Sequence, residues 1–313
     1  MDRISRLSDE LNLPLHRAPV IESFRLELCS SRFKPENISM WVGNAVSHCL
    51  RELDILHEDT YPAKSNILPS NLFTCKSLVT LKLEGDILLD VPRMASLPSL
   101  KTLKLLGVTY LKDGTLQRLI SNCTILEDLV VDLRDNDSMG KLTVLDAYLQ
   151  SLSLYIPYDH GIDELVIDTP SLKYLKLRLH SFNDHYCLIE NMPNMIEAYL
   201  DVELLDINSL IGSITSVKRL AIFSEHHVPL GMDEWNQPST VPECMLSSLQ
   251  SLNWLMYTGK PQERDIVVYI LKHAIHLKTT TIKSPESAVP KFEMLKELVL
   301  SSRASPTCQF MFD

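Results

Sequence analysis

The chain has 313 residues, of which 45% are apolar, and it carries a formal net charge of -10. This acidic balance argues against nucleic acid or an anionic membrane surface as the main partner, because both require clustered lysine and arginine. The seven cysteines form no Cys-x-x-Cys pair, which argues against a disulfide framework or a zinc site and suits a reducing compartment. We therefore expect protein partners.

The start of the chain, MDRISRLSDELN, lacks the apolar core of a signal peptide. No uncharged apolar run in the sequence approaches the ~20 residues that a membrane-spanning helix needs. We therefore expect an intracellular protein, in the cytoplasm or the nucleus, that is not inserted in a membrane.

Residues 2–11, DRISRLSDEL, resemble the opening of the plant F-box, usually D-x-I-S-x-L-P-D-E-L, with Ser8 in place of proline. In that family further helices complete the surface that docks on the adaptor of a cullin-type ubiquitin ligase. Three helices of average length need roughly 30 to 40 residues, whereas only 20 residues precede Ile21 and two prolines interrupt them. We interpret residues 1–20 as a remnant of an F-box and a linker.

From Ile21 onward the pattern Leu-x-x-Leu-x-Leu recurs along the chain. Four central triplets begin 26, 23 and 23 residues apart, within the period of roughly 20 to 29 residues that is typical of a leucine-rich repeat. The triplets begin at Ile21, Leu50, Leu78, Leu100, Leu126, Leu149, Leu172, Met195, Val217, Leu249, Leu277 and Leu295. The pattern predicts an α/β leucine-rich-repeat solenoid, a horseshoe with a parallel sheet on its concave side, with the repeats over residues 21–234.

Local signals between the triplets predict further elements. Turn residues followed by Leu116, Leu119 and Ile120 at helical spacing predict a short helix before the Leu126 triplet. Cys123, just before that triplet, is expected to be structural rather than reactive. Alternating apolar and polar residues over 161–170 predict one short extra strand between repeats.

The C-terminal part, residues 235–313, resembles the plant FBD module. The matching residues are Trp235 to Pro238, Val241 to Cys244, Trp254, Tyr257, Gly259, Glu263, Tyr269 to Lys272, Ala274, Leu277, Lys278, Ile282, Arg303 to Ser305 and Cys308 to Phe310. We expect an FBD-like segment that continues the solenoid. Apolar spacing predicts an amphipathic helix over residues 263–278, with its aromatic residues in the core.

The sequence offers little catalytic chemistry. Nine glycines form no G-x-G-x-x-G or P-loop motif, and no G-x-S-x-G motif is present. The only suggestive ligand groups are His226 and His227 with Asp233 and Glu234, His180 with Asp184 and His185, and the pair His273 and His276. A metal site needs three or four convergent ligands. We therefore expect no enzyme activity, no catalytic residue, no cofactor and no metal.

Side chains alternate between the two faces of a strand, so residues between the apolar positions should point to the concave face. On that face, aromatic and basic residues of neighbouring strands should form one patch. Aromatic residues and arginine often dominate the binding energy of protein interfaces. The predicted partner-binding residues are Tyr155, Tyr174, Lys176, Arg178, Tyr199, Arg219 and Phe223. Lys176 and Arg178 favour an acidic partner segment. The alternative is a solvated sheet face without a partner.

The resemblance implies a substrate-recognition subunit of an SCF-type cullin ubiquitin ligase, which binds a protein through its concave repeat face. Because the F-box is truncated, we expect this chain to be unable to dock on the adaptor. The alternative is a stand-alone leucine-rich-repeat interaction protein with no ubiquitin-ligase link.

Overall fold

The computed structural model describes residues 3–4, 20–28, 34–58, 67–134, 139–157, 160, 162–179, 186–190, 192–202, 207–224, 235, 237–285 and 291–312. The chain forms two compact units. Unit 1 comprises Met1–Thr169 with Ser181–Leu188, and unit 2 comprises Pro170–His180 with Ile189–Asp313.

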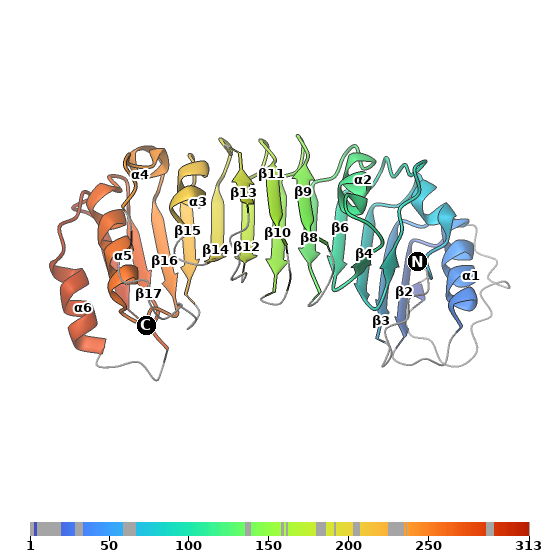
Figure 1. The fold of residues 1–313 in the computed structure, drawn as a ribbon, viewed down its shortest axis with the longest axis horizontal. Helices are drawn as coiled ribbons and strands as arrows, with labels where there is room; N and C mark the ends of the chain where they lie inside the picture. The colour runs from blue at the N-terminus through green and yellow to red at the C-terminus, as the bar shows by residue number, and fades with distance from the viewer. Residues whose placement is uncertain are drawn as a thin grey trace. The chain divides into compact units, whose positions relative to one another are not determined.

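Unit 1 is built on a parallel sheet whose strands lie side by side in chain order (Figure 1). The strands are β1 (Arg3–Ile4), β2 (Ser23–Leu28), β3 (Glu52–His57), β4 (Thr80–Gly85), β6 (Thr102–Leu106), β8 (Asp128–Asp132) and β10 (Ser151–Ile156). Return segments between them hold α1 (Pro35–Val46), the short 3-10 helix η2 (Ser70–Thr74) and α2 (Thr115–Ser121). They also hold the paired strands β5 (Leu88–Leu89) and β7 (Thr109–Tyr110), and strand β9 (Lys141–Leu145). A small separate sheet pairs β9 with β11 (Glu164–Asp168) and β11 with β13 (Tyr186–Ile189), two strands that follow β10 in the chain.

Unit 2 repeats this plan with a second run of parallel strands. They are β12 (Tyr174–Leu179), β14 (Glu197–Val202), β15 (Arg219–Phe223), β16 (Ser251–Leu255), β17 (Thr279–Ile282) and β18 (Gln309–Phe312). The helices of this unit are α3 (Ile207–Ser213), α4 (Glu243–Ser247), α5 (Pro261–His273) and α6 (Lys291–Leu300).

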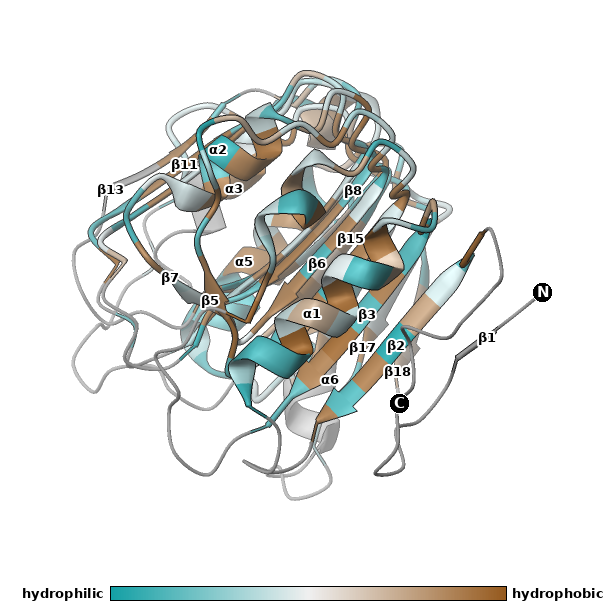
Figure 2. Cartoon of the chain, turned by 90° about the vertical axis from the view of Figure 1, so that its right-hand side faces the viewer, coloured by the Kyte–Doolittle hydropathy of each residue, from teal (hydrophilic) through white to brown (hydrophobic). Residues whose placement is uncertain are grey.

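The parallel α/β leucine-rich-repeat fold predicted from the sequence is confirmed, because the inward residues of each triplet pair with their equivalents on the next strand. Leu103 on β6 lies in register with Leu81 on β4 and with Leu129 on β8, and all three are at most 1% exposed. Burying a leucine contributes about 1.5–3 kcal/mol relative to leaving it exposed. Figure 2 shows the resulting alternation of brown and teal bands along β2.

Serine residues add a polar link between successive turns. Ser77, Ser216 and Ser248 each stand directly before the first apolar residue of a triplet. Their hydroxyl groups donate hydrogen bonds of 2.8–3.0 Å to the carbonyl oxygens of Leu50, Met195 and Val217, the first triplet residues of the preceding repeats. The hydroxyl therefore links each of these turns to the turn before it.

A buried carboxylate fixes the connection between β16 and α5. Glu263 is 1% exposed, and its Oε2 accepts hydrogen bonds from the backbone nitrogens of Thr258 and Gly259 at 2.8 and 2.9 Å. The Thr258 hydroxyl donates a third bond at 3.0 Å. A buried charge is costly unless several donors satisfy it, so this side chain holds the turn that leads into the helix.

Most local predictions are confirmed, and two are wrong. The short helix before the Leu126 triplet is α2, and the extra strand is β11, which pairs with β9 outside the main sheet. The amphipathic helix begins at Pro261 and ends at His273 rather than Lys278, because Ala274 adopts an extended conformation. The triplet at Leu295, Leu298 and Leu300 lies on helix α6. Leucines three residues apart suit a helix face as well as a repeat.

Glycine is required where a strand turns tightly. Gly85 on β4 has φ of +90°, and a Cβ atom built there would lie 2.2 Å from the carbonyl oxygen of His57. Gly107, at the equivalent position after β6, has φ of +63° and no atom within 4 Å of such a Cβ. The two positions share a left-handed backbone and differ in the space available.

We expect Gly85→Ala to lower the free energy of unfolding by at least ~2 kcal/mol, through both left-handed strain and a backbone clash. Gly107→Ala should cost about 1 kcal/mol, because only the strain applies. Urea denaturation followed by circular dichroism compares the two variants. Equal losses of unfolding free energy in the two variants would show that the carbonyl oxygen of His57 does not clash with a Cβ atom at position 85.

Candidate functional site

The outward side chains of the unit 2 sheet form what we call the open face. The face is divided by register into rows that run across the strands. The first row is Tyr174, Glu197, Arg219, Ser251, Thr279 and Gln309, the second is Lys176, Tyr199, Ala221, Asn253, Thr281 and Met311, and the third is Arg178, Asp201, Phe223 and Leu255. The structure thus brings six of the seven predicted residues together on three adjacent strands.

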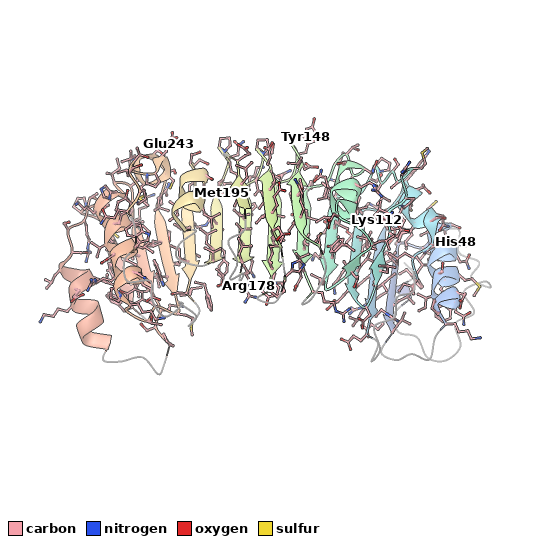
Figure 3. All side chains as sticks on the ribbon, viewed as in Figure 1. His48, Lys112, Tyr148, Arg178, Met195 and Glu243 are labelled. Carbon is pink, nitrogen blue, oxygen red and sulfur yellow. The ribbon has the colours of Figure 1, made fainter. Side chains whose placement is uncertain are left out.

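Two of the predicted cations are held in ion pairs with residues that the sequence prediction left out. Arg178 Nε donates a hydrogen bond of 3.0 Å to Asp201, which is only 2% exposed although it belongs to the open face. Arg219 donates two hydrogen bonds of 2.7 and 3.1 Å to Glu197, with both side chains about half exposed. Figure 3 labels Arg178 at the end of β12. These carboxylates offset most of the basic character of the patch.

Lys176 differs from the two arginines. Within the described part of the chain it makes no ion pair, and its Nζ lies 5.3 Å from the centroid of the Tyr199 ring. An ammonium at this distance from an aromatic ring is attracted by about 0.5–1 kcal/mol at an exposed site. The Tyr199 ring is in turn 6.5 Å from the ring of Phe223. The three side chains form a continuous cation and aromatic strip over β12, β14 and β15.

The strip continues into an uncharged region on β16, β17 and β18. Their outward side chains are Ser251, Asn253, Leu255, Thr279, Thr281, Gln309 and Met311. Leu255 lies in register with Phe223, which extends the apolar part of the strip by one strand. The Thr279 hydroxyl bonds to Ser251 at 3.0 Å. The open face therefore changes from a charged and aromatic half to a neutral half.

The seventh predicted residue, Tyr155, belongs to unit 1, where it lies on β10 in register with Asp132 of β8 and is half-buried. The outward side of the unit 1 sheet carries a chain of charges. Lys82 contacts Asp54 at 3.7 Å and Glu84 at 2.6 Å, and Asp54 also contacts Arg25 at 3.5 Å. Surface pairs of this kind contribute little to stability, and their residues make this face more strongly charged than the open face of unit 2.

The suggested metal ligands do not form a described site. The groups at His180 and at His226 lie outside the described residues. His273 bonds through Nδ1 to the carbonyl oxygen of Tyr269 at 2.8 Å. Among the residues that the structure describes, no three His, Cys, Asp or Glu side chains are placed to hold a metal ion. Over the same residues, no helix has the length and apolar content to cross a bilayer.

Strands paired in register one repeat apart, with leucines buried at fixed positions, define a leucine-rich-repeat protein. The family model for the LRR repeats of FBD-associated F-box protein At5g56370 matches residues 38–195, and the FBD model matches residues 237–282. FBD-associated F-box protein At4g10400 of Arabidopsis thaliana is 54% identical, covering 96% of this chain and 84% of the relative. The chain belongs to the plant family of F-box/FBD/LRR-repeat proteins.

Other relatives from Arabidopsis thaliana support this assignment. FBD-associated F-box protein At5g38590 is 44% identical over 92% of this chain and 82% of the relative. F-box/FBD/LRR-repeat protein At5g56420 is 35% identical over 99% of this chain and 86% of the relative. The FBD match includes β16 and β17, so the neutral half of the open face comes largely from the FBD segment.

Cys123 lies in the core of unit 1, as its predicted structural role requires. The side chain is 1% exposed, and its thiol donates to the carbonyl oxygen of Leu119 at 3.1 Å. Burial raises the pKa of Cys123 to about 12, and burial likewise raises the pKa of Cys244 to about 12. Cys49, in contrast, is exposed.

We expect iodoacetamide at pH 8 to alkylate Cys49 and to spare Cys123 and Cys244. The thiolate is the reacting form, and a thiol with a pKa near 12 forms very little of it at pH 8. Peptide mass spectrometry of native and urea-unfolded protein measures the labelling. Rapid labelling of Cys123 in the native protein would contradict its placement in the core.

Proposed function

We propose that this chain is a protein-recognition module that binds a partner through the open face of unit 2. The observation that carries the proposal is the strip of Lys176, Tyr199, Phe223 and Leu255 on neighbouring strands. Partly buried aromatic side chains beside a cation that makes no ion pair within the described residues resemble the centres of protein interfaces, where aromatic residues dominate the binding energy. An enzymatic role finds no support in the described residues, so we propose binding alone, in the cytoplasm or the nucleus.

Two features of the face suit recognition. Its rigid parallel strands hold the side chains at fixed spacing, so little conformational freedom is lost on binding. The pairs Arg178 with Asp201 and Arg219 with Glu197 lie beside the strip and fix their own side chains. The face therefore presents a preformed surface with a defined chemistry.

We expect the double variant Tyr199→Ala with Phe223→Ser to lose at least one partner that the parent chain captures from a plant-cell extract. Removing both rings deletes the aromatic part of the strip. Tyr148→Ala is the matched control, because Tyr148 is 69% exposed in the turn before β10 of unit 1 (Figure 3). Captured proteins are identified by mass spectrometry. Retention of every partner by a correctly folded double variant would exclude this face.

We further propose that the chain is related to substrate-recognition subunits of cullin-type ubiquitin ligases but does not dock on their adaptor. Relatives of this chain carry the name F-box protein. The alignment with the relative that is 54% identical spans 347 positions but covers 96% of this chain, about 300 of its 313 residues. About 47 positions of the alignment therefore have no counterpart here. This deficit is large enough to hold the roughly 30 to 40 residues that three helices need.

We expect the purified chain to fail to co-purify with the cullin adaptor, because on this proposal it lacks the helices that form the docking surface. Inserting the F-box helices of the 54% identical relative between Leu11 and Leu13 should restore a complex. Size-exclusion chromatography of each chain mixed with adaptor is the measurement. A stoichiometric complex formed by the parent chain would favour an intact docking function. If the insertion also fails, a stand-alone interaction protein becomes the better description.

A further inference from the structure

The second row of the open face has a cationic side chain at one end and neutral hydrogen-bonding side chains at the other. It begins with Lys176 on β12, crosses Tyr199 and Ala221, and reaches Asn253 on β16 and Thr281 on β17. Lys176 is the cation of this face that makes no ion pair within the described residues. Asn253 and Thr281 lie in register, and their side chains form no hydrogen bond within the same residues.

We propose that this row binds an extended peptide segment of the partner that carries an acidic residue at one end and a neutral stretch at the other. The inference rests on the proposed function and specifies the chemistry of the partner. The acidic residue pairs with Lys176, and the peptide backbone bonds to the amide of Asn253 and the hydroxyl of Thr281. Apolar side chains of the peptide reach the neighbouring third row and cover Phe223 and Leu255.

Charge decides the position of the acidic residue. A carboxylate placed at Lys176 gains an ion pair without displacing an existing one, whereas Arg178 and Arg219 already contact Asp201 and Glu197. A charged side chain over Asn253 would find no opposite charge among the outward residues of β16, β17 and β18. It would lose hydration without compensation. The neutral half of the face therefore selects against charge at that end.

The strand spacing sets the length of the segment. Parallel strands lie ~4.8 Å apart, so the three steps from β12 through β14 and β15 to β16 span about 14 Å. An extended peptide rises ~3.3 Å per residue. The acidic residue and the residue over Asn253 should therefore be separated by about four positions, with apolar side chains between them.

The test is selection from a random peptide library displayed on phage, with the full chain as bait. Wild-type protein should enrich peptides that have Asp or Glu at one position and no charge about four positions away. Lys176→Glu should lower the affinity of the selected synthetic peptide at least about tenfold, a loss of about 1.4 kcal/mol. It should also select Lys or Arg in place of the acid. Asn253→Asp should select a cationic residue at the neutral end.

Lys272→Glu supplies the matched control, because it makes the same charge change on the exposed surface of α5, away from the open face. It should leave the selected peptides and their affinities unchanged. Circular dichroism and the melting temperature confirm that each variant is folded.

The outcomes separate this inference from the proposed function. If Tyr199→Ala with Phe223→Ser abolishes partner capture while Lys176→Glu and Asn253→Asp leave peptide selection unchanged, the face binds a partner of different chemistry and this inference is wrong. Enrichment of basic peptides, or of none, overturns it as well. If the double variant keeps every captured partner and the two single variants also have no effect, both proposals fail.

Discussion

Stacking of apolar side chains between neighbouring parallel strands is the interaction on which both units depend. A single strand such as β6 has five residues and cannot bury its own apolar side. Leu103 and Leu105 become fully buried because Leu81 and Leu83 lie in register on one side and Leu129 and Val131 on the other. Stability in such a fold is approximately a sum of repeat and neighbour terms. A polar substitution within the stack therefore acts on two interfaces at once.

The stack also tolerates a polar residue when its hydrogen bond is satisfied. Thr280 occupies an inward position on β17 and is fully buried, and its hydroxyl lies 3.4 Å from the thiol of Cys308, which precedes β18. Phe310 follows on the next strand in register with Thr280. Thr280 breaks the apolar pattern, but its buried hydroxyl has a polar partner, the Cys308 thiol of the last repeat.

The inward residues could be predicted from the sequence, because strand alternation and the repeat period act on the same positions. The prediction failed where one spacing fits two structures. Leu295 and Leu298 are three residues apart, which satisfies both a repeat triplet and one face of α6. The strand that completes the sheet is instead β18, which pairs with β17 from Gln309 onward. The exposure of Gln-Phe-Met-Phe alternates along the strand, but the sequence does not alternate between polar and apolar residues and lacks the leucine spacing that identified the other strands.

The ion pairs of the open face were missed for a different reason. Neither β12, which holds Arg178, nor β15, which holds Arg219, contains an acidic residue. The acidic partners lie on neighbouring strands, a full repeat away in the sequence. Aligning the triplets would have placed Arg178 opposite Asp201 and Glu197 opposite Arg219, as the observed register does. The depth of Asp201 is not visible in this way, since its burial depends on side chains packed around it. Charge on a repeat face is therefore predictable from aligned repeats rather than from single strands.

The two faces of each strand carry separate tasks, and this separation explains how an FBD segment can join a leucine-rich-repeat sheet. On β16 the inward residues Leu252 and Trp254 are fully buried and continue the stack from β15, while the outward residues carry no charge. Glu263 is buried in the core, where it holds the following turn, so it adds no charged side chain to the open face. The outward row can change its chemistry from one repeat to the next without altering the inward packing. A repeat protein can therefore alter what it recognises at the outward positions while the fold is maintained by the inward ones.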